Sequence, residues 1–341
     1  MAVSPLNDDA RCMKALVYIG PNSLVFRDEP DPVPETDEVL VRVEAVGICG
    51  SDMHAYHGFD ARRPPPLILG HEAAGRIATG PRAGERVTIN PLVVDPACPY
   101  AIEGRWHLSP TRQIISMPPR PGAFAELARI PLRNVTPIPE AMPIAHAALA
   151  EPVAVSWHAV RTGMQRLHQP LAACRVVVLG GGAIGLAAGL VARLFGTRDL
   201  VIGETNLQRR ATVLAEGIGV YQPGEDEPGA NSADLVIDAV GADATRAAAC
   251  RIVRPGGVIV HVGLLPGQGG LDVRKITLQE VTLAGVYCYT PADFAQTVEA
   301  LAQGRLGALG WIEQRPLNVG DQAFADIDGG RVGAAKIVLR T

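Results

Sequence analysis

Residues 175–185 read RVVVLGGGAIG, in which an apolar, β-branched run leads directly into a glycine-rich turn. The turn matches the pattern G-x-G-x-x-G, and the residues after it predict a helix through residue 195. The first glycine of such a turn permits a tight bend, the second lets a pyrophosphate approach the backbone, and the third lets helix pack on strand. Free N–H groups and the helix dipole then favour the phosphate charge. The sequence therefore predicts a dinucleotide-binding turn with candidate residues Gly180, Gly182, Ala183, Ile184 and Gly185.

Strand-like and helix-like segments alternate on both sides of this turn. Strand candidates lie at 200–204, 233–241, 256–264 and 280–289, and helix candidates at 156–164, 207–219 and 245–253. Alternation at this length argues for a parallel sheet with helices on both faces. The sequence thus predicts a doubly wound, Rossmann-type domain over residues 155–290.

An acidic residue is expected about 20 residues after the glycine turn, where it binds the ribose hydroxyls of the dinucleotide. Glu204 stands 19 positions after Gly185, at the end of the next strand candidate. Its charge would repel the extra phosphate of NADP, so NAD is the favoured cofactor. Arg209 follows closely and could contact a phosphate, which keeps NADP open. Val240 and Val262, near the ends of two later strand candidates, complete the predicted cofactor contacts.

The first third of the chain has a different character. Short β-branched runs alternate there with loops rich in proline, glycine and histidine, at 14–19, 23–30, 39–47 and 85–91. This pattern predicts an irregular all-β module, to which the last strand candidate, KIVLR at 336–340, is expected to return. We therefore expect an α/β protein with one domain over 1–154 and 291–341 and the other over 155–290.

Composition excludes several classes of function. The 341 residues are too many for one ordinary core, so two domains are expected. The net charge of −4 gives no sign of a nucleic-acid or membrane partner. The longest apolar stretch, 183–195, carries Arg193 and is too short to span a bilayer. Six scattered cysteines without paired spacing, and an N-terminus without a signal-peptide pattern, predict a cytoplasmic protein.

Two segments near the N-terminus carry a candidate metal site. GICGSDMH contains Cys49, and LGHEAAGRI contains His71 and Glu72. Thiolate, imidazole and carboxylate are ligands of zinc ions that keep one position open for chemistry. Glu151, which opens a Glu-Pro step, is a second carboxylate candidate. A lone buried cysteine or histidine is more often a packing residue, but beside a dinucleotide fold the metal interpretation is favoured.

In this order and spacing, the motifs resemble those of the zinc-dependent medium-chain alcohol and polyol dehydrogenases. GICGSDMH, GHEAAG, the Glu-Pro step at 151–152 and GGGAIG carry the resemblance, which covers essentially the whole chain. The Glu-Pro step and VYCYTPADF at 286–294 suggest the branch of sorbitol, 2,3-butanediol and threonine dehydrogenases. The resemblance implies a GroES-like catalytic domain beside the Rossmann domain, and hydride transfer between a secondary alcohol and NAD.

The resemblance also implies roles for the residues of the metal site. Cys49, His71 and Glu72 match the catalytic zinc positions, with Glu151 at the position of the remaining ligand. Which of the two glutamates binds the resting zinc stays open at this point.

Three further residues match the proton-handling part of the family's site. Ser51 matches the hydroxyl residue that hydrogen-bonds the reacting oxygen, and His54 matches the histidine that passes the proton to solvent. Asp52 is expected to orient a metal-bound imidazole.

One departure from the family concerns a second, structural zinc. Its four cysteine positions are occupied here by Asp95, Cys98, Ala101 and Ser109. A single thiol cannot build a closed four-donor site, so we expect one catalytic zinc and no structural zinc. Tyr100 and Trp106 are expected to supply apolar contacts in this lobe, 93–112, in the metal's place.

Two alternative functions stay open on sequence alone. A zinc-free, NADP-dependent quinone or enone reductase of the same superfamily is disfavoured because that branch lacks the Cys and His ligands. A non-catalytic NAD-binding protein is disfavoured by the intact proton-relay residues. The sequence does not choose among a polyol, a sugar acid, a vicinal diol and an amino alcohol as the small-molecule substrate. The strand candidate 280–289 is suited to edge-to-edge pairing, so a homodimer or homotetramer is expected.

Overall fold

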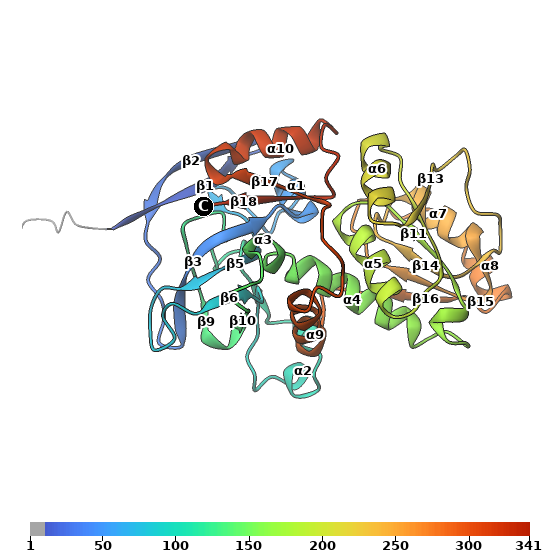
Figure 1. The fold of residues 1–341 in the computed structure, drawn as a ribbon, viewed down its shortest axis with the longest axis horizontal. Helices are drawn as coiled ribbons and strands as arrows, with labels where there is room; N and C mark the ends of the chain where they lie inside the picture. The colour runs from blue at the N-terminus through green and yellow to red at the C-terminus, as the bar shows by residue number, and fades with distance from the viewer. Residues whose placement is uncertain (1–10) are drawn as a thin grey trace, which may run out of the picture.

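The computed structural model describes residues 11–341, which form two bodies joined by helix α4 (Ala150–Met164) (Figure 1). One body is built on a parallel sheet and the other on mainly antiparallel sheets. The predicted α/β class is therefore confirmed. The expectation that the chain has no signal peptide falls largely on residues 1–10, outside the described residues.

The parallel sheet has the strand order β13-β12-β11-β14-β15-β16. Its strands are β11 (Arg175–Leu179), β12 (Asp199–Gly203), β13 (Gly219–Tyr221), β14 (Ala233–Asp238), β15 (Val253–His261) and β16 (Thr282–Gly285). Its helices are α5 (Ala183–Leu194), α6 (Leu207–Ala215), α7 (Asp243–Ile252) and α8 (Val273–Leu278). The order reverses between β11 and β14, and this is the point where doubly wound sheets bind ligands at their carboxyl edge. The predicted Rossmann-type sheet is confirmed.

The other body contains a seven-stranded sheet, a three-stranded sheet and a two-stranded sheet of β7 (Leu92–Val93) and β8 (Gln113–Ile114). The seven-stranded sheet has the order β10-β6-β5-β3-β18-β17 with β9 on β3, and the three-stranded sheet has β2-β1-β4. The strands of these two sheets are β1 (Cys12–Gly20), β2 (Ser23–Pro30), β3 (Glu38–Gly47), β4 (Leu67–Ile68), β5 (Glu72–Ile77), β6 (Arg86–Ile89), β9 (Leu127–Pro131), β10 (Val135–Pro137), β17 (Ile312–Pro316) and β18 (Lys336–Arg340). Because β18 pairs with β3, the C-terminal tail returns to the N-terminal module as predicted. Helix α10 (Gly320–Asp328) covers this body at the top of Figure 1.

Helix α4 belongs to the core of both bodies. One continuous cluster of buried residues includes Ala45 of β3, Trp157 of α4 and Val176 of β11. Helix α9 (Pro291–Ala302) packs against α4 and adds to the same cluster. The relative position of the two bodies therefore depends on side-chain packing around α4.

Several predicted boundaries are wrong, for identifiable reasons. Helix α4 begins at Ala150 rather than at residue 156, because a helix buried between two bodies is apolar on most sides and loses its periodic pattern. Helix α6 ends at Ala215 rather than 219, where Gly217 (φ +71°) takes the left-handed conformation that ends helices. Strand β16 ends at Gly285 rather than 289, and the residues that leave the sheet include Cys288 at φ +48°.

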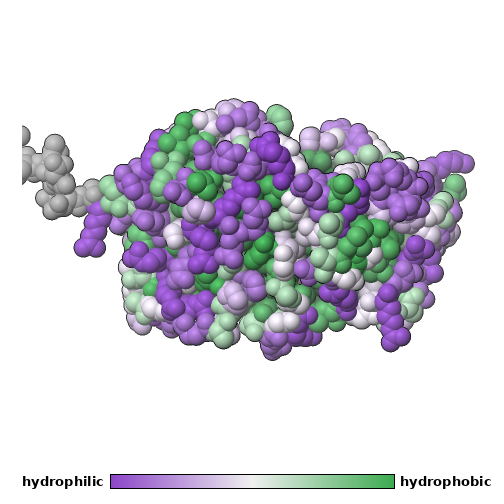
Figure 2. All heavy atoms as spheres, turned by 45° about the horizontal axis from the view of Figure 1, so that its top comes forward, coloured by the Kyte–Doolittle hydropathy of each residue, from purple (hydrophilic) through white to green (hydrophobic). Residues whose placement is uncertain are grey.

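The face of the molecule shown in Figure 2 is mostly polar, and exposed apolar side chains occur at several places. Hydrophilic residues cover much of the face shown in Figure 2, with smaller hydrophobic areas between them. Leu283 of the edge strand β16 is exposed, and so are Val273 and Leu278 of helix α8. Over residues 11–341, no helix has both the length and the apolar character needed to cross a membrane.

The lobe at 93–112 is closed by hydrogen bonds. It contains α2 (Pro99–Ile102) and the 3₁₀ turn η1 (Trp106–Leu108). The Cys98 sulfur accepts a hydrogen bond from the Ala101 N–H at 3.4 Å and lies 3.7 Å from Ser109 Oγ. Trp106 Nε1 donates to the Ala101 carbonyl at 3.0 Å. Cys98 thus contacts both Ala101 and Ser109, so three of the four family ligand positions are joined through its sulfur.

His107 joins this lobe to helix α4. Its buried ring meets the His158 ring edge-on, with 5.1 Å between centroids. His158 Nδ1 lies 2.9 Å from a carboxylate oxygen of Asp293 in α9. Burial, followed by repulsion from His158, lowers the pKa of His107 to about 4. The lobe is therefore docked through an imidazole that is uncharged at neutral pH.

The first prediction concerns the pH dependence of this docking. As the pH falls from about 6.5 towards 4, His107 is protonated in the unfolded chain before it is protonated in the folded chain, so it lowers the free energy of unfolding. Urea unfolding at pH 7 and pH 5 should show that His107→Gln loses less stability between these pH values than the parent protein. Equal losses in both proteins would contradict this role of His107 in the lobe.

Candidate metal and dinucleotide site

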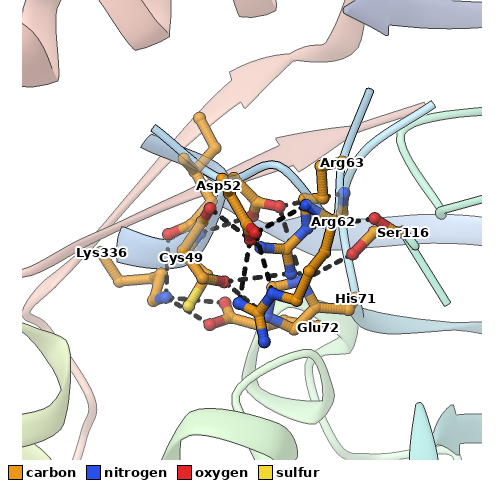
Figure 3. Close-up of polar contacts among 12 residues, drawn as sticks. Cys49, Asp52, Arg62, Arg63, His71, Glu72, Ser116 and Lys336 are labelled. Atoms are coloured by element: carbon orange, nitrogen blue, oxygen red, sulfur yellow. Dashed lines mark hydrogen bonds and ion pairs between the residues drawn. The ribbon is translucent and has the colours of Figure 1, made fainter. Parts of the chain in front are cut away.

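Cys49, His71 and Glu72 lie together where β3 and β5 end their pairing (Figure 3). One potential ligand atom from each lies within 4.8 Å of the others, and no other such group of His, Cys, Asp and Glu occurs in residues 11–341. Cys49 is the N-cap of helix α1 (Gly50–Tyr56), directly after β3. His71 precedes β5, and the pairing of Gly47 with Glu72 brings the two segments side by side.

Glycine at position 47 is needed for this convergence. A Cβ atom on Gly47 would overlap the Glu72 carboxylate. Any other residue there would displace Glu72 or force β3 away from β5. The first glycine of the GICG motif therefore leaves the space that the Glu72 carboxylate, a candidate metal ligand, occupies.

His71 is buried and has polar neighbours at both ring nitrogens. Ser51 Oγ lies 3.5 Å from Nε2, and Ser116 Oγ lies 3.3 Å from Nδ1. Asp52 places Oδ1 3.5 Å from Nδ1, and its other oxygen accepts from the Cys49 N–H at 2.9 Å. Burial by itself lowers the pKa of His71, but the negative charges of Asp52 and Cys49 outweigh it and raise the pKa well above the ordinary value. The surroundings of His71 thus stabilise a positive charge.

Glu72 is paired with a buried lysine. Lys336 Nζ lies 2.6 and 2.7 Å from the two carboxylate oxygens and donates to the Ile48 carbonyl at 2.8 Å. Burial alone lowers the pKa of Lys336, but the charges of Glu72 and Cys49 raise it overall. Lys336 is the first residue of β18, so the C-terminal strand supplies a positive charge to a site built from N-terminal segments.

Glu151 occupies the first turn of α4 and lies outside the 4.8 Å group. It is buried, and burial raises its pKa to about 7, with the Glu72 charge adding to the effect and His71 and Lys336 opposing it. The two candidate carboxylates therefore differ. Both carboxylate oxygens of Glu72 accept hydrogen bonds from Lys336. The raised pKa of Glu151 shows that nearby positive charges do not offset the cost of burying its carboxylate.

Ser51 and His54 lie on α1, and Ser51 stands beside His71. Arg63 donates to the Ser51 carbonyl at 3.2 Å, and its Nη2 lies 3.5 Å from Ser51 Oγ. Burial lowers the pKa of His54, against an opposing effect of Asp60. His54 is therefore uncharged at neutral pH and able to accept a proton.

The glycine turn has the geometry that its motif predicts. Gly180 has φ +98°, and a Cβ on Gly185 would overlap the Gly180 carbonyl oxygen. A Cβ on Gly182 would meet nothing within 4 Å, so open space lies beside the N-cap of α5. Ala183 and Ile184 form the first turn of that helix.

Glu204 follows β12 directly and is held by the backbone. Its two carboxylate oxygens accept hydrogen bonds from the N–H groups of Gly181 at 2.9 Å and Asn206 at 2.7 Å. Arg209 Nη1 lies 3.6 Å from the same carboxylate. Val240 and Val262 follow β14 and β15 at the same carboxyl edge of the sheet.

Helix α4 connects the two groups of candidate residues. Ser156 Oγ, on this helix, donates to the Ile184 carbonyl in the glycine turn at 2.8 Å. Glu151 stands at the beginning of the same helix. A rigid element therefore fixes the separation of the metal-ligand group and the dinucleotide turn.

Sequence reasoning missed Lys336, Ser116 and Arg63, all of which touch the candidate site. The pattern of KIVLR predicts a strand and gives no role to its lysine. A signal did exist, because a lysine that opens an apolar strand in a chain whose only lysines are Lys14, Lys275 and Lys336 is unusual. Ser116 and Arg63 stand in loops without a recognisable pattern.

Two family descriptions match the chain. Residues 35–140 match the alcohol dehydrogenase GroES-like domain, and residues 183–303 match the zinc-binding dehydrogenase family. These matches fall on the antiparallel and parallel bodies respectively.

Individual proteins are similar over nearly the full length. The L-galactonate-5-dehydrogenase of Escherichia coli K12 is 30% identical over 87% of this chain and 89% of its own. The D-xylulose reductase of Saccharomyces cerevisiae is 29% identical over 90% and 91%. A solved structure of a zinc-binding dehydrogenase from Sinorhizobium meliloti, bound to NADP, is 26% identical and superposes with a TM-score of 0.86 over 97% of this chain and 100% of its own.

The second prediction concerns the Lys336–Glu72 pair. Lys336→Met leaves the Glu72 charge buried without its partner, which costs about 3–5 kcal/mol in comparable cases. Thermal unfolding of the purified protein should therefore show a clearly lower Tm for Lys336→Met. The double variant Lys336→Met with Glu72→Gln should recover much of the loss, because both charges are gone. An unchanged Tm in the single variant would mean that the pair contributes little.

Proposed function

Since this chain belongs to the zinc-type medium-chain alcohol dehydrogenase family, we propose that it oxidises a secondary alcohol of a polyhydroxy substrate by hydride transfer to NAD. The observation that carries the proposal is the convergence of Cys49, His71 and Glu72 next to a helix that also contacts the glycine turn. The names of the relatives, an L-galactonate dehydrogenase and a D-xylulose reductase, support polyhydroxy compounds as the substrate class.

The donor set fits one zinc ion. A thiolate, an imidazole and a carboxylate are ligands that zinc binds readily, and the surroundings of His71 already favour positive charge. We propose Cys49 and His71 as ligands, with Glu151 or Glu72 as the third, and no second zinc in the lobe at 93–112. When bound, zinc polarises the substrate oxygen and lowers its pKa.

The chain's own residues then handle the proton. Ser51 Oγ, beside His71, accepts the proton of the substrate hydroxyl and passes it on towards His54. His54, uncharged at neutral pH, accepts it near the surface of α1. Arg63 holds the Ser51 backbone in place for this transfer.

The carboxyl edge of the parallel sheet is the proposed NAD site. The pyrophosphate would lie at the N-terminus of α5, over Gly182, where a Cβ would meet open space. Glu204 would accept hydrogen bonds from the adenosine ribose, with Arg209 beside it and Val240 and Val262 along the nicotinamide half. NAD accepts the hydride, and the protein positions the two reactants.

We also propose a homodimer, or a tetramer of such dimers, and a cytoplasmic location. The edge strand β16 has free backbone groups on one side and exposes Leu283, with Val273 and Leu278 of α8 nearby.

The proposed cytoplasmic location rests on the cysteines. None of the six cysteines is in a disulfide, which suits a reducing compartment. The division into 1–154 with 291–341 and 155–290 is proposed as the domain boundary, within the continuous helix α4.

The alternatives are less well supported. A zinc-free quinone or enone reductase leaves the Cys49, His71 and Glu72 group without a purpose. A non-catalytic NAD-binding protein leaves the Ser51 and His54 pair without one. The metal content and an alcohol-dependent assay separate these three functions.

The third prediction tests the proposed function at its metal site. Cys49→Ser should lose zinc, measured by elemental mass spectrometry, and should lower alcohol-dependent NADH formation by more than about 100-fold, since a polarising metal contributes several kcal/mol. NADH binding, followed by fluorescence, should persist. The matched control is Cys98→Ser in the lobe, which should keep both zinc and activity. Zinc lost from Cys98→Ser and kept by Cys49→Ser would overturn the proposal.

The fourth prediction concerns cofactor choice. Glu204→Ala removes the proposed ribose acceptor and the repulsion of a 2′-phosphate, so the ratio of kcat/KM for NAD to that for NADP should fall by about 10-fold or more. Glu216→Ala, at the far end of α6, is the control and should leave the ratio unchanged. An unaltered ratio in Glu204→Ala would assign the ribose contact to another residue.

A further inference from the structure

The loop after α1 carries more positive than negative charge. Asp60 is bound by two arginines, through Arg62 Nε and Nη2 at 2.8 and 3.0 Å and through Arg63 Nη1 at 2.7 Å. Arg63 is buried, and its other hydrogen bonds go to Ser51 and to the Ser116 carbonyl. The Arg62 side chain is 61% exposed. One carboxylate for two guanidinium groups leaves a surplus positive charge, and Arg62 Nη1 is free to donate.

Arg112 provides a second, unpaired guanidinium. Its central carbon lies 4.8 Å from the centroid of the Tyr287 ring, and its Nη1 donates to the Ser109 carbonyl at 2.8 Å. Within residues 11–341, no carboxylate forms an ion pair with it. Stacking on an aromatic ring fixes the plane of a guanidinium and leaves its edge available for hydrogen bonds. Nη1 is used by the Ser109 carbonyl and a side-chain hydrogen bond with Tyr287 engages the guanidinium as well, so its remaining N–H groups are available.

Both arginines stand in segments that reach the candidate metal site. Arg63, next to Arg62, donates to the Ser51 carbonyl, and Ser116, four residues after Arg112, places Oγ 3.3 Å from His71 Nδ1. Burial raises the pKa of Cys288, the neighbour of Tyr287, to about 12, and the charges of Glu151, Arg112 and Cys49 all act on it as well. The pKa of Arg62 is raised by Asp60 first, with smaller effects from Tyr287 and Cys288. In Figure 3 the Arg62 side chain extends from its loop towards the group of Cys49, His71 and Glu72. The segments that carry Arg62 and Arg112 therefore lie beside the proposed reaction centre, with Tyr287 against Arg112.

We propose that Arg62 and Arg112 bind a carboxylate at the far end of the substrate, so that the preferred substrate is a sugar acid rather than a neutral polyol. This inference rests on the dehydrogenase function proposed above and adds the substrate class. Arg112 can donate to a carboxylate oxygen through an N–H group that neither Ser109 nor Tyr287 uses, and Arg62 Nη1 adds a second charged donor. A neutral hydroxyl group would gain only ordinary hydrogen bonds from these charged donors.

The position of Arg112 also fits such a role. It lies outside the proposed ligand and proton-relay residues, so it can select a substrate without taking part in hydride transfer. Binding energy at a remote group of the substrate orients the reacting carbon. Arg63, in contrast, is occupied by Asp60, Ser51 and Ser116 and acts as a positioning residue.

The test compares matched substrates with the full-length zinc-loaded enzyme and NAD. Six-carbon aldonates are assayed beside the alditols of the same configuration and beside aldonates phosphorylated at the far end, with NADH absorbance as the readout. The inference predicts a kcat/KM at least about 10-fold higher for an aldonate than for its alditol. A sodium chloride series should raise the KM of the aldonate, because the contact is ionic.

Variants connect the preference to the arginines. Arg112→Leu should lower the ratio of kcat/KM for aldonate to that for alditol by about 10- to 100-fold, mainly through KM, and Arg112→Lys should recover part of it. Arg62→Gln should act in the same direction. The matched control is Arg105→Leu, since Arg105 also stacks on a tyrosine of the lobe, at 5.3 Å from the Tyr100 ring, but is paired with Glu103. This control should keep the parent ratio.

The outcomes separate the two proposals. Alditols oxidised as well as aldonates, or an unchanged ratio in Arg112→Leu that still binds NADH, would overturn the sugar-acid inference and leave the dehydrogenase function intact. A preference for the phosphorylated compounds would also overturn it, in favour of a phosphate. Absence of NADH formation with every alcohol would contradict the dehydrogenase function, and the inference with it.

Discussion

The buried ion pair between Lys336 and Glu72 is the contact on which the geometry of the site depends. The site concentrates a thiol and the carboxylates of Asp52, Glu72 and Glu151 in a volume that is largely shielded from water. Buried negative charges of this kind are costly unless they are paired. Lys336 pairs with the charge of Glu72 and also donates to the Ile48 carbonyl next to Cys49. The lysine therefore positions two candidate ligands.

The same pair links the ends of the chain. Strand β18 begins at Lys336 and pairs with β3, which leads into Cys49. The catalytic module can therefore form only when the C-terminal segment has returned to it. The negative charge that remains after Lys336 is counted suits a bound cation, and this supports the proposal of zinc at the site, which would bind His71 in its neutral form.

Helix α4 imposes the second constraint. Hydride transfer requires the reacting carbon and the nicotinamide to be held within a fraction of an ångström of their productive positions. Glu151 at the start of α4 and Ser156 bonded to Ile184 place residues of the proposed metal site and of the proposed NAD site against one helix. Helix α4 is buried in the core that both bodies share, with Trp157 between them. Side-chain packing therefore sets the position of the helix relative to the two bodies.

The sequence predicted the parts of the fold that local patterns encode. RVVVLGGGAIG and the alternation after it were sufficient for the parallel sheet, because buried parallel strands are continuous apolar runs and the glycine turn has a fixed context. The start of α4 was mistaken because a helix apolar on most sides shows no period. The Lys336–Glu72 contact was missed because it joins residues 264 positions apart, and no local pattern indicates which distant strand will carry a counter-charge.

The same limit applies to substrate selection. Arg62 and Arg112 stand in irregular loops, and their importance comes from an imbalance of charge that appears only when the partners of Asp60 and the environment of Tyr287 are known. The motifs therefore indicate the chemistry of the site, whereas its specificity depends on contacts between loops.

Anomalous X-ray diffraction recorded on both sides of the zinc absorption edge, from crystals grown with NADH, addresses the metal assignment most directly. We expect one zinc peak per chain, bonded to Cys49 and His71 and facing the nicotinamide. A zinc peak confined to the lobe at 93–112, or zinc-loaded crystals without density between Cys49 and His71, would contradict the assignment.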